Sequence, residues 1–81
     1  MTSYHPVSCD THSQYELLVM HRSRCEWHYQ GDEGQTQTIV GTATDLQTIN
    51  REEFLLICAD DTSTMSIRLD LIIQYNEQVP P

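Results

Sequence analysis

One stretch near the C-terminal end of the chain places an apolar residue at every second position. The pattern runs for eleven residues and comprises Met65, Ile67, Leu69, Leu71, Ile73 and Tyr75. A period of two is typical of a β-strand that buries one face. Because a usual strand has about 5–6 residues, this stretch predicts two strands, or one strongly bent strand, with a corner near Asp70.

Earlier segments of the chain also predict antiparallel strands. From Arg24, alternation puts Cys25, Trp27 and Tyr29 on one face, and a turn with two glycines follows. Gly41 indicates a bend or bulge in the next strand. The remaining expected elements are the turn at 31–34, a hairpin strand at 35–44, a loop at 45–52, a doubly covered strand at 53–59 and a turn at 60–63.

The N-terminal part predicts one short helix. Ser13 followed by Glu16 three residues later is a capping-box pattern, so we expect the helix at about 13–22, strands within 24–75 and a loose tail at 76–81. An 81-residue chain fits one domain, 1–81. One helix and about five bent strands favour a small antiparallel β-barrel, because closure removes exposed sheet edges.

The charge of the chain argues against nucleic acid as a ligand. Twelve acidic residues outweigh four basic ones, all of them arginines, and the formal net charge is −8. Phosphate binding needs clustered Lys and Arg, so we expect no direct nucleic-acid binding and favour a basic protein as partner. An acidic surface can compete with nucleic acid for a basic groove.

The N-terminal residues and the cysteines indicate the compartment. The first twenty residues lack a signal-peptide pattern, and no apolar run approaches the ~20 residues that span a bilayer. Three cysteines cannot all pair within one chain, which favours a reducing environment. We therefore expect a cytoplasmic protein without a membrane partner.

A metal site is the strongest chemical alternative. Cys9 and His12, followed by His21, Cys25 and His28, have spacings seen in zinc fingers. Cys25 and His28 are three apart on an expected strand, and would face opposite sides. We therefore expect no metal and no cofactor.

Catalytic patterns are weak throughout the chain. Cys9 and His12 could form a nucleophile pair, but no third orienting group or oxyanion loop accompanies them. The adjacent carboxylates at 32–33 and 60–61 lie in expected turns, where such pairs are usually solvated. We expect no enzymatic activity.

Four short segments together suggest a family. They are Tyr4-His5-Pro6-Val7-Ser8-Cys9-Asp10, Tyr15-Glu16-Leu17, Ala43-Thr44-Asp45-Leu46 and Ile67-Arg68-Leu69-Asp70-Leu71-Ile72. In order, spacing and total length they resemble Rof, the Rho-binding antiterminator family of bacteria. The resemblance implies an Sm-like barrel with an N-terminal helix. It also implies binding to the transcription termination factor Rho at or near its primary RNA-binding site.

The resemblance also implies which residues contact Rho. Asp10 and Glu16 are the implied acidic contacts, with Tyr4 and Cys9 positioning the segment. Family members tend to read Cys-Asp-Asp-Tyr-Asp at the helix start. This chain reads Cys-Asp-Thr-His-Ser and so lacks two carboxylates and the tyrosine's aromatic ring. The expected partner-binding set is Tyr4, Cys9, Asp10, His12, Ser13 and Glu16.

These observations lead us to expect an inhibitor of Rho-dependent transcription termination that is monomeric when free. An Sm-like RNA-binding protein is the first alternative, and a small metal-binding domain is the second. The net charge of −8 disfavours an RNA-binding protein. The expected placement of Cys25 and His28 on opposite faces of a strand disfavours a metal-binding domain.

Overall fold

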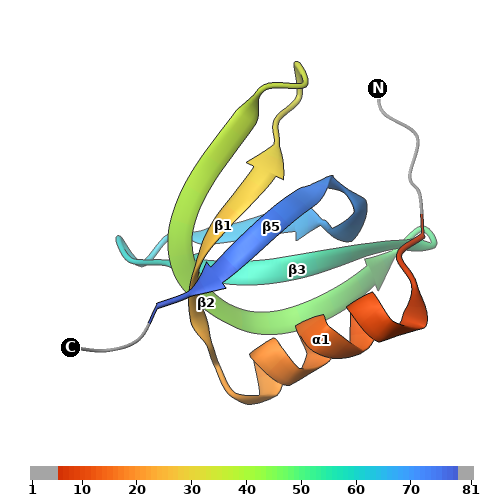
Figure 1. Cartoon of the computed structure of the whole chain (residues 1–81), viewed down its shortest axis with the longest axis horizontal. Coiled ribbons are helices and arrows are strands. Elements are labelled where there is room, and N and C mark those ends of the chain that lie inside the picture. Colours follow the sequence, from red (N-terminus) through yellow and green to blue (C-terminus); the bar gives the residue numbers. More distant parts are fainter. Residues whose placement is uncertain (1–5, 79–81) are drawn as a thin grey trace.

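An N-terminal helix is followed by five antiparallel strands in the computed structural model, which describes residues 6–78 (Figure 1). The mainly β architecture with one helix is confirmed. The elements are α1 (Cys9–Met20), β1 (Arg24–Gln30), β2 (Thr36–Ile49), β3 (Glu52–Ala59), β4 (Thr64–Arg68), the 3-10 turn η1 (Leu69–Leu71) and β5 (Ile72–Glu77).

The strands form one open sheet in the order β4-β3-β2-β1-β5. The long strand β2 pairs with β1 through its first half and with β3 through its second half, and Gly41 belongs to both ladders. The η1 turn then carries the chain from β4, at one edge, to β5, at the other, and within residues 6–78 these two edges do not pair. The expected closed barrel is therefore wrong.

The helix begins four residues earlier than the sequence predicted. Ser8 is the N-cap, because its backbone is extended and its Oγ accepts a hydrogen bond from the Thr11 N–H at 3.2 Å. Ser13 lies inside the helix, so the expected start at 13 and the capping box with Glu16 are wrong. In the described part of the chain, no helix is long and apolar enough to cross a membrane.

The helix also ends earlier than the expected residue 22. Arg22 takes a left-handed backbone conformation, with φ 49°. The N–H of Arg22 donates to the Val19 carbonyl at 3.1 Å, and the N–H of Ser23 donates to the Leu18 carbonyl at 2.9 Å. This pair of bonds satisfies carbonyls of the last turn and stops the helix at Met20.

Two expected irregular segments are strand. The expected loop at 45–52 is mostly the second half of β2, and the chain reverses through Asn50 and Arg51, both left-handed with φ 51° and 67°. The expected tail begins within β5, which extends to Glu77, and the Gln78 N–H still donates to the Arg24 carbonyl at 2.8 Å. Residues 79–81 of that tail lie outside the described residues.

The regular alternation from Met65 to Tyr75 is two strands with a corner, as predicted, and Asp70 lies in the corner. Beyond it the alternation does not hold. The β1–β5 register shifts so that Ile73 has no partner and is 58 % exposed, whereas Ile72 packs on the core. An unpaired bulge residue of this kind changes which side chains face inward.

The core is one cluster on the inner face of the sheet, covered by α1. Tyr15 and Leu18 are its helical members, and the rings of Tyr15 and Trp27 each lie against Tyr75, with centroids 5.8 and 5.4 Å apart. The strands and the corner contribute Cys25, Trp27, Ala43, Leu55, Ile57, Ile67 and Leu69.

Gly41 permits a close approach between the backbones of β2 and β3. A Cβ at this position would lie 2.6 Å from Ile57 Cγ2, 2.7 Å from the Cys58 carbonyl oxygen and 2.9 Å from Ala59 Cα. The Gly41 carbonyl also accepts a hydrogen bond from the buried Trp27 indole at 3.0 Å. A side chain here would push β2 away from β3 and from the indole.

We predict that Gly41→Ala lowers the free energy of unfolding by about 1–3 kcal/mol, because overpacking at rigid backbone cannot be relieved locally. Gly31→Ala is the matched control. The three atoms nearest to a Cβ there belong to the flexible side chains of Gln35 and Gln37, at 3.0 Å. Urea denaturation measures both variants, and equal stability of the two would contradict the close approach at Gly41.

Alkaline pH should destabilise the fold. Burial, aided by nearby Tyr75, raises the pKa of Tyr15 from 10.0 to about 12. Burial, aided by Glu77, raises the pKa of Cys25 from 9.0 to about 11. Above pH 9 the unfolded chain loses these protons first, so stability falls as pH rises toward 12. Thermal melts between pH 8 and 11 measure this.

In the same melts, the Cys25→Ala variant should have a lower melting temperature at every pH. Because it lacks the buried thiol, its melting temperature should fall less steeply above pH 9. A parent melting temperature that stays constant to pH 11 would show that burial does not hold these protons.

Candidate functional site

The candidate site is the solvent-exposed face of α1. At 100° per residue, six exposed residues fall on the side opposite Tyr15 and Leu18, spaced so that neighbours are three or four apart. We call this surface the helix face, and its residues are Cys9, Asp10, Ser13, Glu16, Leu17 and Met20.

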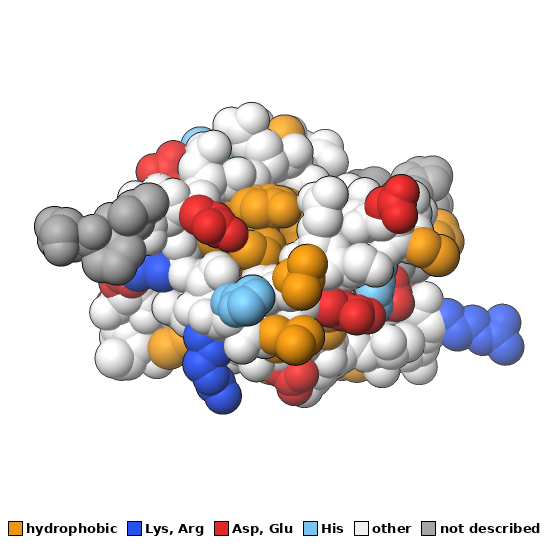
Figure 2. All heavy atoms as spheres, turned by 60° about the horizontal axis from the view of Figure 1, so that its bottom comes forward, with side chains coloured by type: hydrophobic (Ala, Val, Ile, Leu, Met, Phe, Trp, Pro, Cys, Tyr) orange, Lys and Arg blue, Asp and Glu red, His pale blue; other side chains and the backbone are white. Residues whose placement is uncertain are grey.

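The helix face combines carboxylates with exposed apolar side chains. Leu17 is 52 % and Met20 is 75 % exposed, and both are adjacent to Glu16 in the helix. On this side of the molecule hydrophobic, acidic and histidine side chains lie close together (Figure 2). Apolar side chains rimmed by charged ones are typical of protein-binding surfaces rather than of solvated helices.

His12 links the helix face to the sheet. Its Nδ1 lies 2.8 Å from a Glu16 carboxylate oxygen, and its Nε2 lies 3.1 Å from a carboxylate oxygen of Glu53, on β3. Both contacts are hydrogen bonds when both ring nitrogens carry protons, as in the imidazolium form. The pairing fixes the direction of the Glu16 carboxylate and ties the first half of α1 to β3.

The opposite side of the helix is held by aromatic packing. Tyr15 and Leu18 are 4 % and 5 % exposed, and the Tyr75 hydroxyl donates to the Gln14 side-chain oxygen at 3.2 Å. Because these anchors lie on the buried side, the helix face has a fixed orientation on the sheet.

Five of the six residues expected to contact Rho lie on α1. Cys9 and Asp10 start the first turn, where a carboxylate complements the helix dipole. Ser13 and Glu16 are exposed on the helix face, whereas His12 lies at its margin, half-buried against Glu53. Tyr4 lies outside the described residues.

Two of the four arginines are paired with carboxylates. Arg24 contacts Asp60, and hydrogen bonding from Arg24 is the main reason that the pKa of Asp60 lies below its ordinary value. Arg68 contacts Asp70 at 2.6 Å and Glu52 at 3.4 Å. Neither pair lies on the helix face, and within residues 6–78 no ion pair joins an arginine to Asp10 or Glu16.

The residues considered for a metal site are distributed over different surroundings. Cys25 is fully buried in the core, whereas His28 lies on the outer side of β1, 2.8 Å from Glu26. His12 is occupied by two carboxylates, and Cys9 is an exposed free thiol. Within residues 6–78, no group of three or more His, Cys, Asp or Glu side chains is placed to hold a metal ion.

Sequence reasoning missed three contributors to this surface. Leu17 and Met20 were not among the residues expected to contact a partner, although helical spacing from Tyr15 and Leu18 puts them on the exposed side of the helix. That spacing was the available signal. No pattern in the sequence pointed to Glu53, because its contact with His12 joins residues 41 apart in the sequence and depends on how α1 lies against β3.

The chain was compared with protein-family models, with curated proteins and with solved structures, and none of the three comparisons gives a match.

We predict that His12→Ala loosens the start of α1. Losing two partly exposed contacts with carboxylates should cost about 1 kcal/mol or less, and amide exchange in the first two helical turns should accelerate more than exchange in the strands. His21→Ala is the control, since it follows the helix and forms no ion pair among the described residues. Unchanged exchange in His12→Ala would remove the proposed link to β3.

Proposed function

We propose that this protein inhibits Rho-dependent transcription termination, and that the helix face binds Rho at or near its primary RNA-binding site. In this proposal the protein is a Rof-like antiterminator that is not an enzyme. The observation that carries it is the exposure of Asp10 and Glu16, the two implied acidic contacts, on one surface with Leu17 and Met20.

The sequence resemblance supports the proposal independently of charge. The four segments that resemble Rof extend from Tyr4 to Ile72 and keep their order and spacing. The helix followed by five antiparallel strands agrees with the element order of the Sm-like architecture that the family implies. We propose an Sm-like relationship on that order, with a sheet that stays open.

Charge supports competition with RNA. A surface that binds transcripts is basic, and this protein carries the opposite sign, so its carboxylates can pair with the cations that would hold phosphates. Carboxylates steer and orient the encounter, while Leu17 and Met20 supply apolar area that becomes dehydrated on docking.

Single substitutions on the helix face test this assignment. Glu16→Gln keeps a hydrogen-bonding group beside His12 and removes the charge. We therefore expect an unchanged melting temperature and Rho binding weakened up to about 5-fold, the range for one exposed ion pair. Leu17→Ala should weaken binding about 10-fold if this side chain is a central anchor. Calorimetric titration of purified Rho measures both.

Glu33→Gln is the matched control, because it makes the same charge change in the β1–β2 turn, away from α1. It should bind Rho like the parent. If Glu16→Gln, Leu17→Ala and Glu33→Gln all bind as the parent does while folded, the helix face is not the contact surface. If the parent does not bind Rho at all, the proposed function is wrong.

A further inference from the structure

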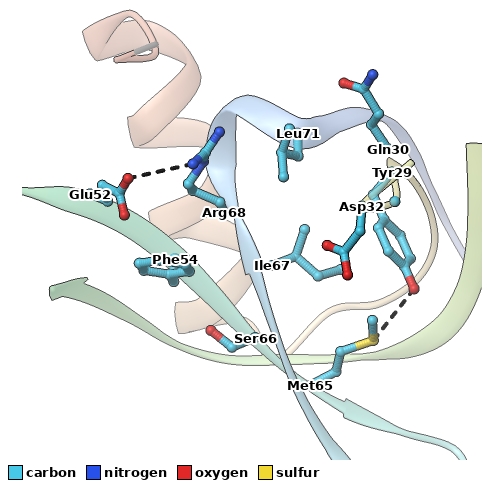
Figure 3. A pocket seen from close by; sticks show the side chains of 11 residues that line it. Tyr29, Gln30, Asp32, Glu52, Phe54, Met65, Ser66, Ile67, Arg68 and Leu71 are labelled. Atoms are coloured by element: carbon cyan, nitrogen blue, oxygen red, sulfur yellow. Dashed lines mark hydrogen bonds and ion pairs between the residues drawn. The ribbon is translucent and has the colours of Figure 1, made fainter. Parts of the chain in front are cut away.

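A cavity of about 300 Å³ lies on a part of the molecule that α1 does not line. It opens between the end of β1, the start of β3, β4 and the η1 corner, where the sheet fails to close (Figure 3). Its size is at the lower end of small-ligand pockets. It can therefore hold a single side chain or a ligand of similar size.

Part of the cavity wall is apolar and aromatic. Tyr29 and Phe54 contribute aromatic rings, and Ile67 and Leu71 contribute aliphatic groups between them. The Tyr29 hydroxyl lies 3.7 Å from the Met65 sulfur (Figure 3). These groups favour an alkyl or otherwise weakly hydrated part of a ligand.

One end of the cavity is formed by an arginine that is already neutralised. Arg68 donates to both carboxylate oxygens of Asp70, at 2.6 and 3.1 Å, and to Glu52 at 3.4 Å. The Arg68 and Asp70 side chains are 14 % and 5 % exposed. An anionic ligand would have to displace these carboxylates, so the cavity is unsuited to phosphates or carboxylates.

The other end holds a carboxylate without a cation. The Asp32 side chain projects toward Ile67 and Tyr29 (Figure 3). Within the part of the chain that the structure describes, Asp32 forms no ion pair or hydrogen bond. The turn that carries it is fixed by backbone hydrogen bonds from Gly31 to Gln35 at 2.7 Å and from Gly34 to Gly31 at 3.0 Å.

We propose that this cavity binds an alkyl-guanidinium or alkyl-ammonium group, with the cation at Asp32 and the alkyl stem along Ile67 and Leu71. Aromatic surface from Tyr29, which lies beside Asp32, adds favourable interaction with the cation (Figure 3). Such a group is carried by an arginine or lysine of a partner protein or by a free small amine. The site is separate from the helix face, and either proposal can fail without the other.

A matched pair of small ligands tests the chemistry. Butylguanidinium and butylurea have nearly the same shape, and one is charged. In amide NMR titrations at low ionic strength, butylguanidinium should shift the resonances of Tyr29 to Asp32 and of Ile67 in a saturable way, and butylurea should bind at least about 3-fold more weakly. Equal binding of the two, or no saturable shift, would overturn the proposal.

Variants of neighbouring acids locate the cation. Asp32→Asn should weaken butylguanidinium about 3- to 5-fold, in the range of a partly exposed ion pair. Glu33→Gln, one residue away and not lining the cavity, should leave it unchanged. If the two variants are equally affected, the attraction comes from net charge and the site assignment is wrong.

A third ligand distinguishes the source of the cation. N-acetyl-arginine N-methylamide presents the guanidinium as it occurs within a polypeptide. Binding tighter than that of butylguanidinium assigns the cavity to an arginine of a partner protein. Equal or weaker binding assigns the cavity to a free small cation. Either assignment requires that Asp32→Asn weakens the binding of butylguanidinium.

Discussion

At Gly41, strand β2 changes partners, and its backbone approaches β3 more closely than any side chain would permit. The same residue pairs with Cys25 of β1 and Ala59 of β3, and its carbonyl accepts the hydrogen bond of the Trp27 indole at 3.0 Å. Trp27 is fully buried and lies against Tyr75, which in turn contacts Tyr15 of the helix. A continuous series of packed groups therefore connects the bend in β2 to α1. A small domain has little additional core that could compensate if one of these contacts were lost.

This packing determines what the surface offers. Since Tyr15 and Leu18 fill the core side of α1, Leu17 and Met20 face solvent beside Glu16, and His12 connects that carboxylate to β3. The open sheet has a second consequence. Because β4 and β5 do not pair, a partly apolar cavity forms, with Asp32 at one end and the neutralised Arg68 at the other. The two candidate binding surfaces thus arise from different features of one fold and have different chemistry.

Local pattern predicted the strands better than it predicted the ends of elements or long-range contacts. Alternation placed β1 and the corner at Asp70 because a period of two is a property of neighbouring residues. The helix start was misplaced because Ser8 and Ser13 are both plausible caps, and only the backbone conformation distinguishes them. Closure of the sheet was wrongly expected because edge pairing depends on where the η1 turn directs the chain. In the candidate site, Asp10 and Glu16 were expected from the resemblance and Leu17 and Met20 were missed. Glu53 and the Asp32 cavity depend on tertiary placement that no short motif encodes.

The central claim is that the helix face and RNA compete for the same surface of Rho. Fluorescence anisotropy of a labelled single-stranded RNA oligonucleotide bound to Rho tests this directly when the unlabelled protein is titrated in. The account predicts that the anisotropy falls to the value of free oligonucleotide, with a midpoint that rises in proportion to oligonucleotide concentration. An increase in anisotropy, which reports a ternary complex of Rho, oligonucleotide and protein, would contradict it. So would anisotropy that stays constant while the protein binds Rho in a parallel titration.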